Sequence, residues 1–211
     1  MPTAHAEGGV APPSAGAPAS PPWASLDTRQ RAELTLPGVL IGLTGGVIAG
    51  AMAGLGGLST VDTLAAGLAL AVPLALAGAG YELLLAAGRI PLGPLTPMAI
   101  YWALAFPVAR VIHAALVNLI AGDPVAVPHG WLDFVVYQAL LSVGFAIGFW
   151  WLHQTFAPGW WFRLRDRNPV ASYFIQRQLG FVGAMYEDRE QRRKRRKQKR
   201  SGGESRERRK R

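Results

Sequence analysis

The chain has 211 residues and a formal net charge of +9, which is enough for one compact domain with tails. It contains no cysteine, and this excludes disulfides, thiolate nucleophiles and cysteine-ligated metal sites. Its apolar residues are concentrated between polar segments at 1–35 and 163–211. Arginine far outnumbers lysine, and Ala, Gly and Pro are abundant, a composition typical of a GC-rich bacterial gene.

The N-terminal segment 1–35 begins with a stretch rich in Ala, Pro, Gly and Ser, and we expect it to be a disordered tail. Its last part, 26–36, mixes Asp, Arg and Glu with apolar residues and is compatible with a short helix. Pro37 follows, and proline suits the first position of a helix. The first membrane segment is therefore predicted to begin at Pro37.

Four apolar segments follow at 37–58, 62–87, 97–121 and 131–157. Each exceeds the about 20 residues that a helix needs to cross a hydrocarbon core about 30 Å thick. They are apolar on all sides, whereas a helix of a soluble domain has a polar face. The sequence therefore predicts an all-α integral membrane protein, with a four-helix transmembrane bundle over 36–158.

The first segment carries two rows of small residues at four-residue spacing. One row is Gly42, Gly46, Gly50 and Gly54, and the other contains Gly45 and Gly57. Positions four apart share a helix face, and small faces allow membrane helices to approach closely. The second segment has a small face of its own at Gly67, Ala71, Ala75 and Ala79. The glycine face is predicted to pack on that segment or on another subunit.

The distribution of basic residues predicts the orientation. Lys and Arg lie before the first segment, between the second and third, and after the fourth, with Arg110 as the single exception. The other two loops contain none. Because cytoplasmic loops are enriched in Lys and Arg, both termini are expected in the cytoplasm, with the chain in the bacterial plasma membrane. Interfacial anchors are expected at Trp150, Trp151, Trp160 and Trp161.

Polar residues inside the spans are candidates for function, since lipid penalises unpaired polar groups. The candidate intramembrane site comprises Arg110, His113, Glu82, Gln138 and Asp133. Counting about 1.5 Å per residue places Glu82 at the depth of His153 near the inner face, and Arg110 nearer mid-membrane. The acceptors weighed for Arg110 are Gln138, Tyr137, Asp133, Glu82 and the carbonyl freed by Pro107. The cluster is either an anion, headgroup or proton site, or a polar network that fixes helix packing or contacts a partner.

No catalytic residue, cofactor or metal is predicted. His113 and His153 lie about 18 Å apart in depth, too far to ligate one haem iron. The spans contain no HxxxH, HExxH or GxSxG pattern and no phosphate-binding glycine loop. An enzyme is therefore not expected, and no family motif is matched residue by residue.

The segment after the fourth span is predicted to lie at the membrane surface. It comprises a juxtamembrane part, 159–187, compatible with an amphipathic helix over 168–186, and a basic disordered tail, 188–211. Anionic lipid headgroups are the expected partners, at about 1 kcal/mol per basic residue near the surface. The residues concerned are Arg163, Arg165, Arg167, Arg192, Arg193, Lys194, Arg195 and Arg196. An acidic protein is the alternative, and the lack of aromatic residues in the tail argues against nucleic acid.

Two functions remain open from the sequence. The leading hypothesis is a non-enzymatic structural or accessory subunit of a larger membrane complex, or a homo-oligomer, that packs through its glycine-rich first helix. The alternative is a small transporter or channel with a polar site around Arg110, His113 and Glu82.

Overall fold

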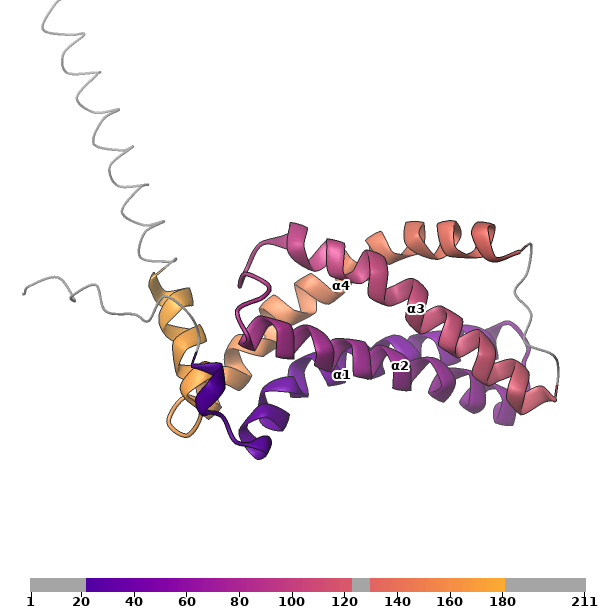
Figure 1. The fold of residues 1–211 in the computed structure, drawn as a ribbon. Helices are drawn as coiled ribbons and strands as arrows, with labels where there is room; N and C mark the ends of the chain where they lie inside the picture. Colours follow the sequence, from indigo (N-terminus) through magenta and orange to yellow (C-terminus); the bar gives the residue numbers. More distant parts are fainter. Residues whose placement is uncertain (1–21, 123–129, 181–211) are drawn as a thin grey trace, which may run out of the picture.

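The computed structural model describes residues 22–122 and 130–180, and these form an all-helical bundle (Figure 1). The predicted four-helix bundle is confirmed, and all four long helices are long and apolar enough to span a membrane. The elements are a short η1 (Trp23–Ser25), α1 (Thr28–Leu55), α2 (Thr60–Ala86), α3 (Leu95–Ala121) and α4 (Trp131–Leu164). A further short helix covers 169–180.

Helices α1 and α4 extend furthest beyond their predicted limits. Helix α1 begins at Thr28, because Asp27 and Gln30 form a capping box that satisfies free backbone N–H groups there. Residues 28–36 are therefore part of the first long helix, and Pro37 lies inside it. Helix α4 likewise continues through Pro158 to Leu164. Proline removes one helical hydrogen bond, and these helices tolerate that loss.

Helices α1 and α2 form the closest pair, and they run side by side in opposite directions (Figure 1). A Cβ added at Gly42 would lie 2.6 Å from the Ala75 backbone nitrogen, and one at Gly46 would lie 2.6 Å from that of Ala71. Only glycine permits this approach. The face seen in the sequence therefore packs on α2 within the chain.

The contact face differs from the predicted rows at both ends. It extends to Gly38, which faces Gly78 of α2, and continues through Gly50 to Gly54, which lies against the Thr63 side chain. Gly57 does not belong to it: α1 ends at Leu55, and Gly57 lies in the following turn with a φ of +94°. There, glycine serves a left-handed backbone conformation.

Helices α3 and α4 cross each other on one side of this pair (Figure 1). They are less buried than α2. Within an apolar stretch of 18 residues in each helix, 56 % of the residues are buried in α2, compared with 22 % in α4 and 11 % in α3. The N-terminal part of α4 is the most open, with Leu132 and Leu140 each about 70 % exposed or more. These side chains leave an exposed apolar surface on α3 and α4.

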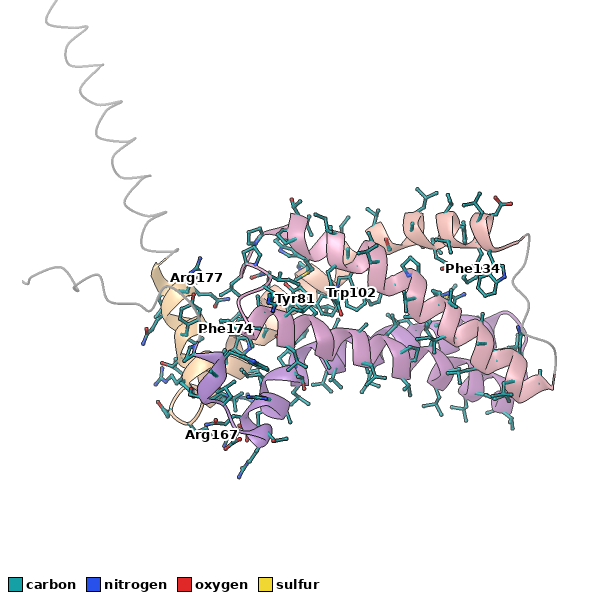
Figure 2. All side chains as sticks on the ribbon, viewed as in Figure 1. Tyr81, Trp102, Phe134, Arg167, Phe174 and Arg177 are labelled. Carbon is teal, nitrogen blue, oxygen red and sulfur yellow. The ribbon has the colours of Figure 1, made fainter. Side chains whose placement is uncertain are left out.

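The core is aromatic and lies toward the end of the bundle at which α1 begins and α4 ends. It contains Tyr81 and Trp102, which are labelled in Figure 2, together with Phe149 and Trp161. All four are at most 1 % exposed. Their rings pack edge-on or tilted against one another, and Phe149 stacks nearly parallel on His153, with centroids 4.7 to 5.8 Å apart. Trp161 is therefore a core residue and not the interfacial anchor expected from the sequence, because α4 turns its indole toward 169–180.

The helix 169–180 is fixed to the start of α1 by one buried side chain. The amide nitrogen of Asn168 donates to the Gln30 carbonyl at 3.0 Å, and its oxygen accepts from the Val170 and Ala171 backbone N–H groups. Gln30 reciprocates by donating to the Arg167 carbonyl at 2.7 Å. The start of α1 and the end of α4 therefore lie together at one end of the bundle.

Candidate functional site

Three of the five predicted polar residues come together between α3 and α4. Arg110 Nε donates to Gln138 Oε1 at 3.3 Å, and Arg110 Nη1 lies 3.0 Å from His113 Nδ1. Because a guanidinium carries only donors, His113 Nδ1 must accept, and the His113 proton therefore lies on Nε2. Gln138 is 3 % exposed, so α4 presents a fully buried amide to the arginine.

The positive charge of Arg110 has no counter-charge in the described part of the chain. Both of its acceptors are neutral side chains. Asp133, the only carboxylate of the predicted set near this depth, is exposed and makes no ion pair with Arg110. Tyr137, another acceptor considered, is 59 % exposed. The site is thus a hydrogen-bonded cation whose charge the described residues do not neutralise.

Glu82 belongs to a different site. Its Oε1 lies 2.9 Å from His153 Nε2, and both residues are 1 % exposed. The rings of Tyr81, Phe149 and Trp161 surround the imidazole. His153 and Gln138 are 15 residues apart on α4, about 22 Å along its axis. The structure therefore separates Glu82 from the Arg110 cluster. It pairs Glu82 with His153, the residue that counting along the helices had placed at the same depth.

The two polar sites are separated by aromatic side chains. On α3, Trp102 and Phe106 lie between the levels of the two sites, and on α4 Phe145 does the same. Trp102 and Phe145 have ring centroids 4.6 Å apart, and Phe106 and Phe145 5.0 Å. Among the described residues, aromatic rings therefore lie between the two sites, and no polar side chain connects Arg110 with Glu82.

The basic residues at and just after the end of α4 have three different environments. Arg167 pairs with Glu33 of α1 at 3.4 Å. Arg165 lies over the Phe162 ring, 3.8 Å from its centroid, and 3.5 Å from Asp166. Arg163 has no ion pair or hydrogen bond with any residue that the structure describes. The predicted lipid contacts at Arg192, Arg193, Lys194, Arg195 and Arg196 lie outside the described residues.

The contacts that sequence reasoning missed join residues far apart in the chain. Trp160 Nε1 donates to the Glu33 carbonyl at 2.7 Å, and the Tyr101 hydroxyl donates to the Ala77 carbonyl at 2.6 Å. Nothing local marks these pairs. The described residues contain no group of three His, Asp or Glu side chains placed to hold a metal ion.

Comparison of the chain with known protein families, with curated proteins and with solved structures finds no match.

Proposed function

We propose that this chain is a non-enzymatic accessory subunit of a larger complex in the bacterial plasma membrane. Its docking surface is the face of α3 and α4 around Arg110. The observation that supports this proposal is the Arg110 charge, which has only neutral acceptors within the described chain. A partner helix that brings a carboxylate to this level would neutralise it.

The energetics favour such a partner. An arginine at the centre of a membrane helix costs about 2.5–3.5 kcal/mol on insertion scales. Hydrogen bonds to Gln138 and His113 satisfy donors of the guanidinium, but they leave its net charge in a low-dielectric environment. Polar side chains of this kind hold membrane helices together when the partner supplies the complementary group. Arg110 also lies on α3, the least buried of the four helices: only 11 % of its 18-residue apolar stretch is buried, so a partner could reach this helix.

The glycine face of α1 is not the proposed docking surface. Its residues from Gly38 to Gly50 lie against α2 of the same chain, so no second helix reaches them. The subunit hypothesis therefore depends on α3 and α4. The transporter alternative has less support, because Glu82 pairs with His153 and aromatic rings lie between that pair and Arg110.

The proposed orientation keeps both termini in the cytoplasm. The charge pattern of the loops supports it. At the shared end of the bundle, residues 22–36 and 159–180 contain six arginines and three carboxylates, a net charge of +3. Contact with anionic headgroups by this end and by the basic tail is part of the same proposal.

The test is affinity purification of the full chain in mild detergent, with mass spectrometry of the proteins that accompany it. We expect a membrane protein with an intramembrane Asp or Glu to accompany the wild type and to be lost in Arg110→Met. Ile112→Ala, on the exposed side of the same helix, is the matched control and should retain the partner. The proposal fails if Arg110→Met retains every partner, or if the wild type is recovered alone and intact. The transporter alternative would be supported if the isolated chain in liposomes conducts an ion or solute and Arg110→Met abolishes that flux.

A further inference from the structure

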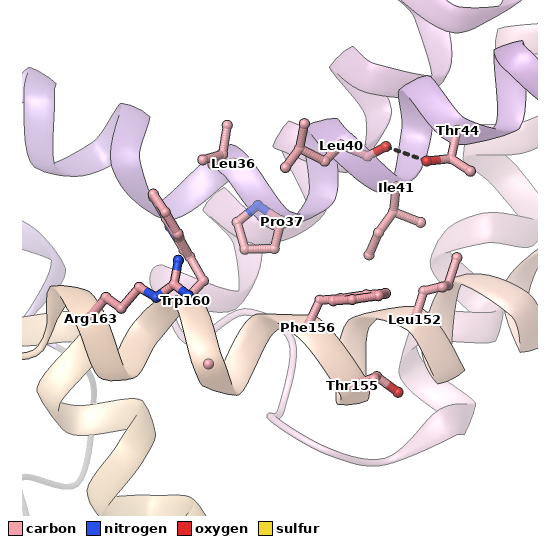
Figure 3. A pocket seen from close by; sticks show the side chains of 11 residues that line it. Leu36, Pro37, Leu40, Ile41, Thr44, Leu152, Thr155, Phe156, Trp160 and Arg163 are labelled. Atoms are coloured by element: carbon pink, nitrogen blue, oxygen red, sulfur yellow. Dashed lines mark hydrogen bonds between the residues drawn. The ribbon is translucent and has the colours of Figure 1, made fainter.

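An open-sided groove lies between α1 and α4, away from the Arg110 face. Its larger part has a volume of about 530 Å³ and is lined by Pro37 and Leu40 on one side and Phe156 and Trp160 on the other (Figure 3). An adjoining part of about 270 Å³ shares the lining residues Ile41, Thr44 and Leu152. Ligand sites in proteins have volumes of about 300–1,000 Å³, and the groove is of that size.

The walls of the groove are apolar, and their polar groups are used internally. The Thr44 hydroxyl donates to the Leu40 carbonyl at 2.9 Å, the contact drawn in Figure 3. The Thr155 hydroxyl donates to the Trp151 carbonyl at 2.8 Å. Trp160 donates its indole N–H to Glu33. A ligand in the groove therefore meets hydrocarbon along most of its length.

One charged group lies at the mouth of the groove. Arg163 lines the larger part beside Trp160 (Figure 3), and it has no hydrogen bond or ion pair among the described residues. Its neighbours Arg165 and Arg167, by contrast, each contact a carboxylate. An unpaired guanidinium at the end of an apolar channel matches a phosphate, which arginine binds through two parallel hydrogen bonds. The net positive charge of this end of the bundle adds to that preference.

Two glycines of α4 open the groove, and helix packing does not explain them. A Cβ added at Gly148 or Gly159 would have no other protein atom within 4 Å. Both residues line the groove. The absence of side chains there keeps the space free.

The length of the groove fits one leaflet of a bilayer. Arg163 and Leu152 are 11 residues apart on α4, about 16 Å along the helix. Half of a hydrocarbon core about 30 Å thick is about 15 Å. With Arg163 at the headgroup level, the larger part ends near mid-membrane.

We propose that this groove binds one anionic glycerophospholipid, with an acyl chain between α1 and α4 and its phosphate against Arg163. The lipid comes from the leaflet at the arginine-rich end of the bundle. This site lies on residues other than those of the Arg110 face. It rests on the proposed contact of this end of the bundle with anionic headgroups, and its test does not involve Arg110, on which the subunit proposal depends.

Native mass spectrometry of the full chain, released from nanodiscs of equal phosphatidylglycerol and phosphatidylcholine, tests the proposal. The wild type should retain one phosphatidylglycerol. Arg163→Gln should reduce the preference for phosphatidylglycerol about tenfold, the equivalent of about 1.4 kcal/mol. Arg89→Gln is its control, because Arg89 is exposed in the loop between α2 and α3 and lies outside the groove, and it should leave the preference unchanged. Gly148→Leu and Gly159→Leu should reduce retention of any lipid, whereas Gly144→Leu, which has equal free space but lies outside the groove, should not.

A second measurement needs no variant. Phosphatidylglycerol with a photoactivatable group in its acyl chain should cross-link to peptides that contain Leu40, Leu152 or Phe156. Equal retention of the two lipids by the wild type, cross-links confined to other faces, or a groove occupied by a helix of a second copy or of another protein would each overturn the proposal.

Discussion

His153 Nε2 on α4 lies 2.9 Å from Glu82 Oε1 on α2, inside an aromatic core that excludes solvent from both side chains. The pair joins two helices that also meet through the Tyr81 ring of α2, which packs against Phe149 and His153 of α4. The second carboxylate oxygen of Glu82 has no partner among the described residues. A single polar contact therefore links α4 to α2 in this layer of the bundle, and its loss leaves a buried polar group behind.

We expect Glu82→Ala and His153→Ala each to lower the free energy of unfolding in detergent micelles by about 1–3 kcal/mol, because each leaves the other residue buried without its partner. The double variant should fall short of additivity by at least about 0.5 kcal/mol. Denaturant unfolding followed by circular dichroism measures all three, with Gln154→Ala as the control. Strict additivity would mean that the two side chains do not interact.

Substitution in the glycine face should separate α1 from α2. Gly46→Leu places a side chain where a Cβ already meets the Ala71 backbone, so overpacking should cost about 3 kcal/mol or more. Gly144→Leu makes the same chemical change on α4 with no other atom within 4 Å of its Cβ, and it should leave the stability nearly unchanged. Thermal unfolding in one detergent compares the two. Equal melting temperatures would contradict the tight α1–α2 contact.

The Arg110 charge can be neutralised from within the chain. Gln138→Glu brings a carboxylate to the position of the amide oxygen that Arg110 already contacts at 3.3 Å. A charged hydrogen bond contributes about 1.5–3 kcal/mol, so the isolated chain should become more stable by roughly that amount. The same variant should release the proposed partner, since Arg110 no longer needs it. Gln138→Leu is the comparison and should destabilise the isolated chain. A loss of stability in Gln138→Glu would show that Arg110 is not short of a counter-charge.

Asn168 should control the attachment of 169–180. Asn168→Ala removes one hydrogen bond to Gln30 and two that cap the helix, at a local cost of about 1–3 kcal/mol. Trypsin should then cleave after Arg167 and Arg177 faster than in the wild type, as followed by mass spectrometry. Gln176→Ala, an exposed change on the same helix, is the control. Unchanged cleavage would assign the attachment to the buried Phe174 and Val170 instead.

The proposed orientation has a direct test, because the chain has no cysteine of its own. A cysteine at Gln176 should react with a membrane-impermeant maleimide only in permeabilised cells, and one at Leu58 should react in intact cells. Both positions are exposed at opposite ends of the bundle. The reverse pattern would invert the topology and contradict the assignment of basic loops to the cytoplasm.

The sequence alone determined the four long helices and the glycine face, because both are properties of spacing along a single chain segment. Length and hydropathy identify a spanning helix, and four-residue spacing identifies a face. The depth count even placed Glu82 level with His153. The limits of α1 and α4 were less accurate, because the cap at Asp27 and the interior Pro158 depend on contacts and geometry at the helix ends.

Only the tertiary structure decided how the helices face one another. Residue counting gives the position of a side chain along a helix axis but not its direction around that axis relative to a neighbour. That direction depends on how the helices pack and cross. Packing therefore turned Gly42 and Gly46 toward α2, paired Glu82 with His153 instead of Arg110, and left Arg110 with neutral acceptors. It also placed Arg163 at the mouth of an apolar groove. The groove is lined by residues of both α1 and α4, so the sequence of either helix alone does not predict it.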